Sequence, residues 1–256
     1  MDKSLNKAMV ALASMPDSFD ALSETVDILM GLLPGKTPKE DVMNFVIRWL
    51  GQPQKLKKLF KHILASEQLS VTVAAQSYGH NNSFMKLVLF RSKDGHQLWV
   101  HARWPNPRGF KEDLAHNHRA DFISYMVAGA LHFDLLQECV EPTYDVCNRY
   151  IDHRPNGKDE TALLSLGPGL AKFTERNVPV VKGQSYHFDM HTLHRLVVPI
   201  GDTSGSLSVV LRNPRVRDYT TMLTAEECNS NFMPSVPSLS PSELQTLCAC
   251  IVRTFL

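Results

Sequence analysis

The stretch AHNHRADFISYMVAG, residues 115–129, places two histidines two residues apart just before an apolar run that ends at a glycine. On a β-strand, residues i and i+2 point to the same face, with Cα atoms about 6–7 Å apart. On a helix the same two side chains would point in nearly opposite directions. If this segment is extended, His116 and His118 can therefore converge on one metal ion. A third ligand must then come from another strand.

A second cluster of histidines lies in KGQSYHFDMHTLHRLVVPI, residues 182–200. Its members are His187, His191 and His194. A helix would align all three, but Gly183, Pro199 and the β-branched residues 197–198 oppose a helix. Alternation along a strand instead puts His194 at the start of a face that can look into a barrel beside the first pair. The spacing alone leaves His191 as a competing third ligand.

Bulk composition is that of an ordinary globular protein, with 256 residues, 43% hydrophobic and 21% charged. The formal net charge of +1 creates no field that would attract nucleic acid or an anionic membrane. No run of apolar residues reaches the ~18 needed to span a bilayer, and the N-terminal residues lack a signal-peptide core. We therefore predict a cytoplasmic protein without nucleic-acid or membrane partners.

Hydrophobic periodicity predicts helices in the first part of the chain. Residues 17–33 carry apolar residues at spacings of three and four. The segment Thr37-Pro38-Lys39-Glu40 resembles a helix start with a capping threonine, and a third helical run covers residues 56–64. From about residue 70 the pattern becomes extended. LSVTVAA (69–75), SFMKLVLF (83–90) and HQLWVHARW (96–104) each have the composition of a strand.

The extended pattern continues to about residue 214. Two strands flank Gly129, and further strands are expected at 177–181, in 182–200 and at 205–214. The polar segment 138–175 is expected to form loops at a barrel mouth. Many short strands without intervening helices predict a mainly β (α+β) jelly-roll barrel. The expected organisation is a helical N-terminal extension (1–70) packed on the barrel, the barrel itself (71–220), and a tail (221–256). The capping box at 240–243 opens a C-terminal helix in that tail.

Two spaced motifs resemble those of the cupin superfamily. Gly109-x6-His116-x-His118-x10-Gly129 is similar to the first cupin motif, and Pro179-x3-Gly183 before the later histidines is similar to the second. The resemblance implies a double-stranded β-helix barrel with a metal site. The first motif usually carries a glutamate ligand after the second histidine, and Phe122 stands at that position here. The resemblance therefore implies a site of three histidines.

Three-histidine cupins include cysteine dioxygenase and its relatives, which the region 83–215 resembles. The segment Tyr186-x2-Asp189-x3-Leu193-His194-Arg195-Leu196, followed by Ser206-Leu207, is similar to the family's sequence around its third iron ligand. This resemblance implies that His194 joins His116 and His118 in binding Fe(II), with another divalent transition metal as the alternative. We take Tyr186, Asp189 and His191 as candidate catalytic residues. Asp121, His132 and His187 are further candidates for contacts around the ligands or substrate.

The chain also departs from the cysteine dioxygenase pattern. The family carries a Ser-His-Tyr set on the strand after the third ligand, and in this resemblance Val209 and Leu211 take the places of the histidine and tyrosine. The cysteine that can crosslink to that tyrosine has no counterpart near Phe122. The family's substrate-binding arginine has three candidates here: Arg91, Arg103 and Arg212. Cysteine itself is therefore not the expected substrate.

Three neutral imidazoles on Fe(II) leave positions open for a substrate and O2. We therefore predict a mononuclear non-haem iron oxygenase or dioxygenase that oxidises a small amino-acid, amine or thiol substrate. One alternative is a metal-dependent cupin of another reaction type, an isomerase, lyase or hydrolase that uses its metal as a Lewis acid. A third hypothesis is a non-catalytic cupin that binds a small molecule.

Overall fold

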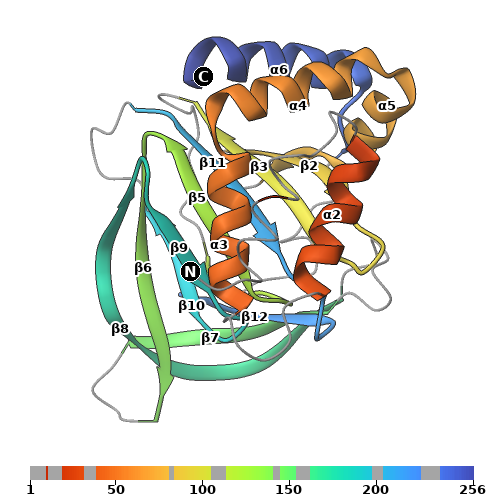
Figure 1. The fold of residues 1–256 in the computed structure, drawn as a ribbon. Helices are drawn as coiled ribbons and strands as arrows, with labels where there is room; N and C mark the ends of the chain where they lie inside the picture. Colours follow the sequence, from red (N-terminus) through yellow and green to blue (C-terminus); the bar gives the residue numbers. More distant parts are fainter. Residues whose placement is uncertain are drawn as a thin grey trace.

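A computed structural model describes residues 10, 19–31, 39–80, 84–104, 114–140, 145–153, 162–197, 204–225 and 237–256 of the chain. The strands form two antiparallel sheets (Figure 1). The first sheet contains, in spatial order, β1 (Tyr78–His80), β2 (Phe84–Arg91), β3 (Gln97–Arg103), β11 (Ser206–Arg212), β5 (Phe122–Ala128) and β9 (Ser185–Phe188). The second sheet closes on itself as β10 (Leu193–Val197), β4 (Ala115–His116), β12 (Tyr219–Thr224), β7 (Asp145–His153), β8 (Ala162–Val181) and β6 (Ala130–Cys139).

The chain crosses between the two sheets several times, as in a jelly roll. β5 lies in the first sheet and β6 in the second, and Gly129 alone joins them. Gly129 has φ +70°, and a Cβ atom there would lie 2.0 Å from the carbonyl oxygen of Gly205. Only glycine fits this conformation and this close approach. The predicted fold class, mainly β with helices before and after the strands, is confirmed.

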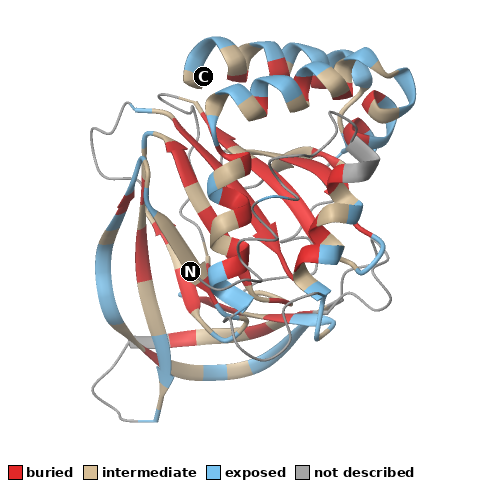
Figure 2. Ribbon diagram, viewed as in Figure 1, coloured by how far each residue is buried: buried red, intermediate tan, exposed pale blue. Residues whose placement is uncertain are grey.

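Helices cover the outer face of the first sheet (Figure 1). They are α2 (Phe19–Gly31), α3 (Lys39–Leu50), α4 (Pro53–Ala65), α5 (Glu67–Gln76) and α6 (Pro241–Phe255). One hydrophobic core lies between these helices and the sheet, where Val46, Phe60 and Ile251 pack with Val100 and Val209. In Figure 2 these helices carry buried residues, drawn in red, where they lie against the strands. The helical layer therefore packs against the outer face of the first sheet and buries its apolar side chains.

A second hydrophobic core lies between the two sheets. Trp99, Phe122 and Met126 of the first sheet pack there with Phe133 and Leu196 of the second. Each strand of the first sheet thus has one face toward the helices and one toward the second sheet, because successive strand residues point to opposite faces. Side chains on this second face are the ones that can approach the predicted metal ligands. None of the described helices combines the length and apolar character needed to cross a bilayer.

Two secondary-structure predictions are wrong. Residues 69–75 belong to helix α5, although their β-branched residues favour a strand. The Ser66 hydroxyl caps this helix by accepting from the Leu69 N–H at 3.3 Å, and Val73 and Ala74 are buried in the helical core. Packing and capping thus override the intrinsic preference.

The segment 138–175 was expected to form loops, but most of its described residues are in strands. β7 and β8 pair over residues 145–153 and 162–171, and β8 continues to Val181. In these strands Leu164 and Leu166 are exposed and Asp152 is buried, so the hydrophobic alternation is weak. The expected cap at Thr37 lies outside the described residues, and α3 begins at Lys39. The division of the chain at residues 70 and 220 stays a prediction.

The predicted capping box of the C-terminal helix is confirmed and permits a stability test. Ser240 Oγ accepts from the Glu243 N–H (3.3 Å), and the Glu243 carboxylate accepts from the Ser240 N–H (2.7 Å). Ser240→Ala is expected to lower the free energy of unfolding in urea by about 1 kcal/mol. Thr246→Ala is the control, because its exposed hydroxyl donates only to Ser242 O within the helix. Equal losses in both variants would contradict a specific role for the cap.

Candidate metal centre

The three predicted ligands meet in the second sheet. His116 lies in β4 and His194 in β10, and the two residues are direct partners in the antiparallel pairing of these strands. His118 follows two residues after His116. The potential ligand nitrogens of the three rings lie within 4.8 Å of one another, with 3.1 Å between the Nε2 atoms of His118 and His194. The structure therefore brings together a three-histidine group that can hold a metal ion.

Backbone carbonyls orient two of the rings. His116 Nδ1 lies 2.7 Å from Leu114 O, and His194 Nδ1 lies 3.0 Å from Thr192 O. A ring nitrogen that faces a carbonyl oxygen must carry the proton, so the Nε2 atom of each neutral ring keeps its lone pair. This pattern of an Nδ1–H bond behind a free Nε2 is typical of histidines that bind metals.

The donor set fits a divalent transition metal. Two nitrogens bound at about 2.1 Å to one ion, at right angles, are about 3.0 Å apart, close to the observed spacing of His118 and His194. Burial holds the pKa of both imidazoles well below the usual value, and the neighbouring histidines lower it further. Both rings are therefore neutral at pH 7, which is the form that binds a metal. Imidazole nitrogen suits Fe, Cu, Ni and Zn.

Aromatic side chains of the first sheet form a wall beside the histidines. Phe188 stacks on His194 with ring centroids 4.0 Å apart, and Phe122 meets His118 edge-on at 4.6 Å. Phe133, from the second sheet, lies 6.0 Å from His194. Phe122, which the resemblance placed at the position of the usual cupin glutamate, thus stands beside the group, and it cannot ligate a metal. Within the described residues, the candidate metal group consists of the histidines alone.

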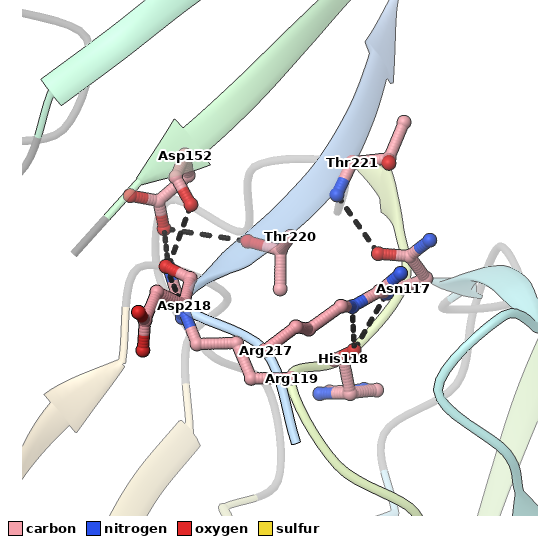
Figure 3. Close-up of polar contacts among 8 residues, drawn as sticks. All are labelled: Asn117, His118, Arg119, Asp152, Arg217, Asp218, Thr220 and Thr221. Carbon is pink, nitrogen blue, oxygen red and sulfur yellow. Dashed lines mark hydrogen bonds and ion pairs between the residues drawn. The ribbon is translucent and has the colours of Figure 1, made fainter. Parts of the chain in front are cut away.

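Hydrogen bonds fix the backbone around the first two histidines (Figure 3). Asn117 pairs with Thr221 of β12 twice, through its backbone N–H (3.1 Å) and through its side-chain oxygen (2.8 Å). Arg119 donates to the Asp152 carboxylate at 2.8 Å, and both side chains are largely buried. These contacts extend the β4–β12 pairing past the end of β4. They keep His118 in place although it lies outside a regular strand.

Arg217 connects two of the ligand segments (Figure 3). Its Nε and Nη2 atoms donate to His118 O at 3.0 and 2.7 Å, and Nη2 also contacts Met190 O in the turn before His194. Sequence reasoning missed this residue. It lies in an irregular segment after β11, and no periodicity or motif distinguishes it from the neighbouring Arg215.

Tyr186, a candidate catalytic residue, lies close to the centre. It is packed against Phe133 and Phe188 at ring distances of 5.0 and 5.2 Å. Burial raises the pKa of Tyr186 to about 12, while the nearby hydroxyls of Ser124 and Ser208 act in the opposite direction. The phenol therefore keeps its proton at neutral pH. Its catalytic role stays a prediction.

The other two catalytic candidates lie on the exposed turn between β9 and β10. Asp189 Oδ1 accepts from the N–H groups of His191 (2.8 Å) and Thr192 (2.7 Å) and from the Thr192 hydroxyl (2.8 Å), so it shapes the turn. His191 is exposed and is not part of the three-histidine group. The geometry thus favours His194 over His191 as the third ligand. Catalytic roles of Asp189 and His191 remain predictions.

Three further candidates point elsewhere. The His187 ring lies 3.5 Å from Glu40 of α3, on the helix side of the first sheet. His132 neighbours Phe133 on β6 but points to the opposite face of that strand. Asp121 accepts from the Met190 N–H at 2.8 Å and thereby holds the turn, in place of the expected contact with an imidazole.

The resemblance placed Val209 and Leu211 where cysteine dioxygenases carry a histidine and a tyrosine, and in the structure neither side chain faces the candidate metal centre. Both side chains are buried in the core under the helices. Alternation along β11 puts Ser208 and Val210 on the face toward the second sheet instead. Neither of these can replace a histidine–tyrosine pair chemically.

The three candidate arginines have structural partners away from the histidines or lie at strand ends. Arg91 is exposed and donates to Gln76 Oε1 at 3.0 Å. Arg212 donates to Gly95 O at 3.4 Å, and burial, with the nearby charges of other arginines, lowers its pKa to about 9. Arg103 is buried at the end of β3, opposite Ser206.

Comparison with known proteins gives only distant similarities. No family model and no curated protein sequence matches the chain. Solved structures with similar portions include ectoine synthase from P. lautus (16% identity over 61% of this chain and 87% of that one, TM-score 0.30). They also include a cupin superfamily protein from Desulfitobacterium hafniense DCB-2 (9%, 53% and 81%, TM-score 0.27) and hydroquinone 1,2-dioxygenase from Sphingomonas sp. TTNP3 (10%, 57% and 72%, TM-score 0.30). Because these TM-scores are below 0.5, we base no inference about activity on them.

Proposed function

We propose that the protein is a mononuclear non-haem Fe(II) oxygenase that oxidises a small amino-acid, amine or thiol substrate. His116, His118 and His194 would hold the metal. The observation that supports this proposal is the group of three histidines, two of them with Nδ1–H groups on carbonyls, beside Phe122 at the usual carboxylate position. When bound, Fe(II) would supply open coordination positions for a substrate and O2.

The charge of the site favours an anionic substrate group. Three neutral imidazoles leave the whole charge of a divalent ion uncompensated, whereas a site with a carboxylate ligand neutralises part of it. A substrate thiolate or carboxylate would provide the missing negative charge. The apolar wall of Phe122, Phe133 and Phe188 keeps water away from His194, which strengthens that electrostatic attraction.

Residues of the first sheet offer polar contacts for the rest of the substrate. Tyr186 and Ser124 are direct partners in the pairing of β9 with β5, and Ser208 lies on the same face of β11. The hydroxyls of Ser124 and Ser208 are buried and lie beside the Tyr186 phenol, whose pKa they hold below the value that burial alone would give. We infer that these groups and the protonated phenol of Tyr186 orient a polar part of the substrate.

Metal analysis and O2 uptake test the proposal. Protein purified without added chelator is expected to bind about one equivalent of metal per chain. After anaerobic loading with Fe(II), O2 consumption is expected with at least one member of a panel of amino acids, amines and thiols. Protein loaded with Zn(II) should consume none. Turnover without O2 would instead support an isomerase, lyase or hydrolase, and failure to bind any divalent metal would refute both enzyme hypotheses.

A further inference from the structure

An irregular stretch of chain, residues 213–218, lies against the backbone that follows β4. The Asn213 N–H donates to Asp121 O at 3.0 Å. The Val216 N–H donates to Arg119 O at 3.1 Å. Neither the stretch nor the backbone that it contacts is in a regular strand at these positions. The two bonds therefore continue the pairing of the second sheet beyond its strands and place the side chains of the stretch next to the metal ligands.

The Arg217 side chain extends from this stretch to two ligand segments. Its Nε and Nη2 atoms donate to His118 O at 3.0 and 2.7 Å (Figure 3), and Nη2 also contacts Met190 O. The guanidinium carbon lies 4.9 Å from the centre of the Tyr219 ring, and this cation–π contact restrains the side chain further. Because the donors of a guanidinium are fixed in one plane, Arg217 holds the two carbonyls in a defined relation.

The Met190 carbonyl belongs to the turn that orients the His194 ring. This turn ends at Thr192, whose carbonyl oxygen lies 3.0 Å from His194 Nδ1. Both backbone groups of Met190 are bound, the N–H by the Asp121 carboxylate (2.8 Å) and the carbonyl by Arg217. A shift of the turn would move the carbonyl that orients His194. Arg217 opposes such a shift.

The two rings that depend on these contacts have closely spaced nitrogens. The Nε2 atoms of His118 and His194 are 3.1 Å apart. Two imidazole nitrogens at this distance either share a proton or bind one cation, and a small change in backbone separation alters both. His118 lies outside a regular strand, whereas His116 and His194 are partners in strand pairing. Its position therefore depends on side-chain contacts to its backbone, and a site that is ordered before the ion arrives binds that ion more tightly.

We propose that Arg217 is a positioning residue, which sets the spacing of the His118 and His194 nitrogens and thereby the affinity of the centre for its metal. The inference deepens the proposed function and rests on its three-histidine metal centre, but not on the reaction that the metal supports. A guanidinium is no metal ligand, so the effect passes through the two backbone carbonyls. A purely structural role would lower the stability of the protein without changing metal affinity in the folded state.

Metal affinity measures the effect directly. In Arg217→Gln the affinity for Zn(II), measured by competition with a coloured chelator, is expected to fall roughly 10–100-fold, the usual cost of removing a partner behind a metal ligand. Loss of a nearby positive charge would by itself strengthen the binding of a cation, so charge does not explain this result. Arg217→Lys should recover part of the affinity, because it keeps the charge but lacks the planar donors.

Arg215→Gln is the matched control for Zn(II) binding. It removes an exposed arginine from the same stretch of chain and should keep the wild-type affinity. Equal affinities in the wild type and Arg217→Gln would overturn the proposal. If Arg217→Gln does not fold, Arg217→Lys takes its place, and a wild-type affinity in that variant would overturn the proposal.

A spectroscopic signature separates positioning from loss of stability. The visible spectrum of bound Co(II) reports the number and arrangement of its ligands, and it is expected to change in Arg217→Gln. Ser240→Ala is expected to lower stability from α6, on the other side of the first sheet, and should keep the Co(II) spectrum and the Zn(II) affinity. Equal changes in Ser240→Ala and Arg217→Gln would assign the effect to stability and refute a positioning role.

The two proposals fail in distinguishable ways. A wild-type protein that binds no divalent metal refutes the three-histidine centre and, with it, the role of Arg217. Wild-type metal binding with an unchanged affinity in Arg217→Gln refutes the role of Arg217 alone. Metal binding that depends on Arg217 but supports no O2 consumption refutes the proposed oxygenase and leaves the role of Arg217 standing.

Discussion

His194→Ala is expected to weaken metal binding by roughly 100-fold or more, since even loss of a partner behind a ligand costs 10–100-fold. The Nε2 atom of His194 lies 3.1 Å from the Nε2 atom of His118, and the Nδ1 atom of His194 faces the carbonyl oxygen of Thr192. Its removal leaves two histidines, which cannot hold a divalent ion tightly. Metal content after dialysis and competition with a coloured chelator measure the loss.

Matched histidine variants give this test its controls. His187→Ala removes a ring that faces Glu40 on the helix side, and should keep the wild-type metal affinity. His116→Ala removes a less buried ligand, so a folded variant without metal is expected even if His194→Ala is unstable. His191→Ala should also keep the metal. Loss of metal in His191→Ala, with retention in His194→Ala, would show that the third ligand has been assigned to the wrong residue.

Gly129→Ala is expected to reduce the free energy of unfolding by about 2–5 kcal/mol. Part of this cost is the positive φ of +70°, which is unfavourable for alanine. The remaining loss of stability arises because the new methyl group would lie 2.0 Å from the carbonyl oxygen of Gly205. The backbone at residue 129 or at residue 205 must then shift. Urea denaturation with and without the substitution measures the difference.

Gly183→Ala separates these two contributions. Gly183 has a φ of +88°, but a Cβ atom there would meet nothing within 4 Å. Its replacement should therefore cost only the backbone strain, about 1–2 kcal/mol. If both variants lose the same stability, the close approach between residues 129 and 205 contributes nothing and the explanation is incorrect.

The metal group was predictable because strand geometry relates side-chain direction directly to sequence spacing. The i, i+2 pair His116 and His118 and the alternation around His194 depend on a period of two, whereas the choice of His194 over His191 came from the resemblance to cysteine dioxygenase. The role of Arg217 in connecting two ligand segments was not predictable in this way. Arg217 acts from an irregular segment, and its hydrogen bonds go to backbone carbonyls that carry no sequence signal.

The secondary-structure predictions failed where the local preference of the residues and the tertiary structure disagree. Val71 and Val73 favour a strand, yet the Ser66 cap and burial of Val73 against the helical core place them in α5. The β7–β8 pair escaped prediction because burial there does not follow hydrophobicity: Leu164 and Leu166 are exposed and Asp152 is buried, which breaks the alternation that identifies a half-buried strand.

The ligands and the main aromatic wall belong to different sheets. The histidines come from β4, β10 and the residues just after β4, while Phe122 and Phe188 come from β5 and β9. Substitutions in the wall strands can therefore reshape what fits beside the metal without altering the residues that bind it. In the proposed enzyme, changes confined to one sheet would alter which substrate fits, while the other sheet would keep the metal ligands.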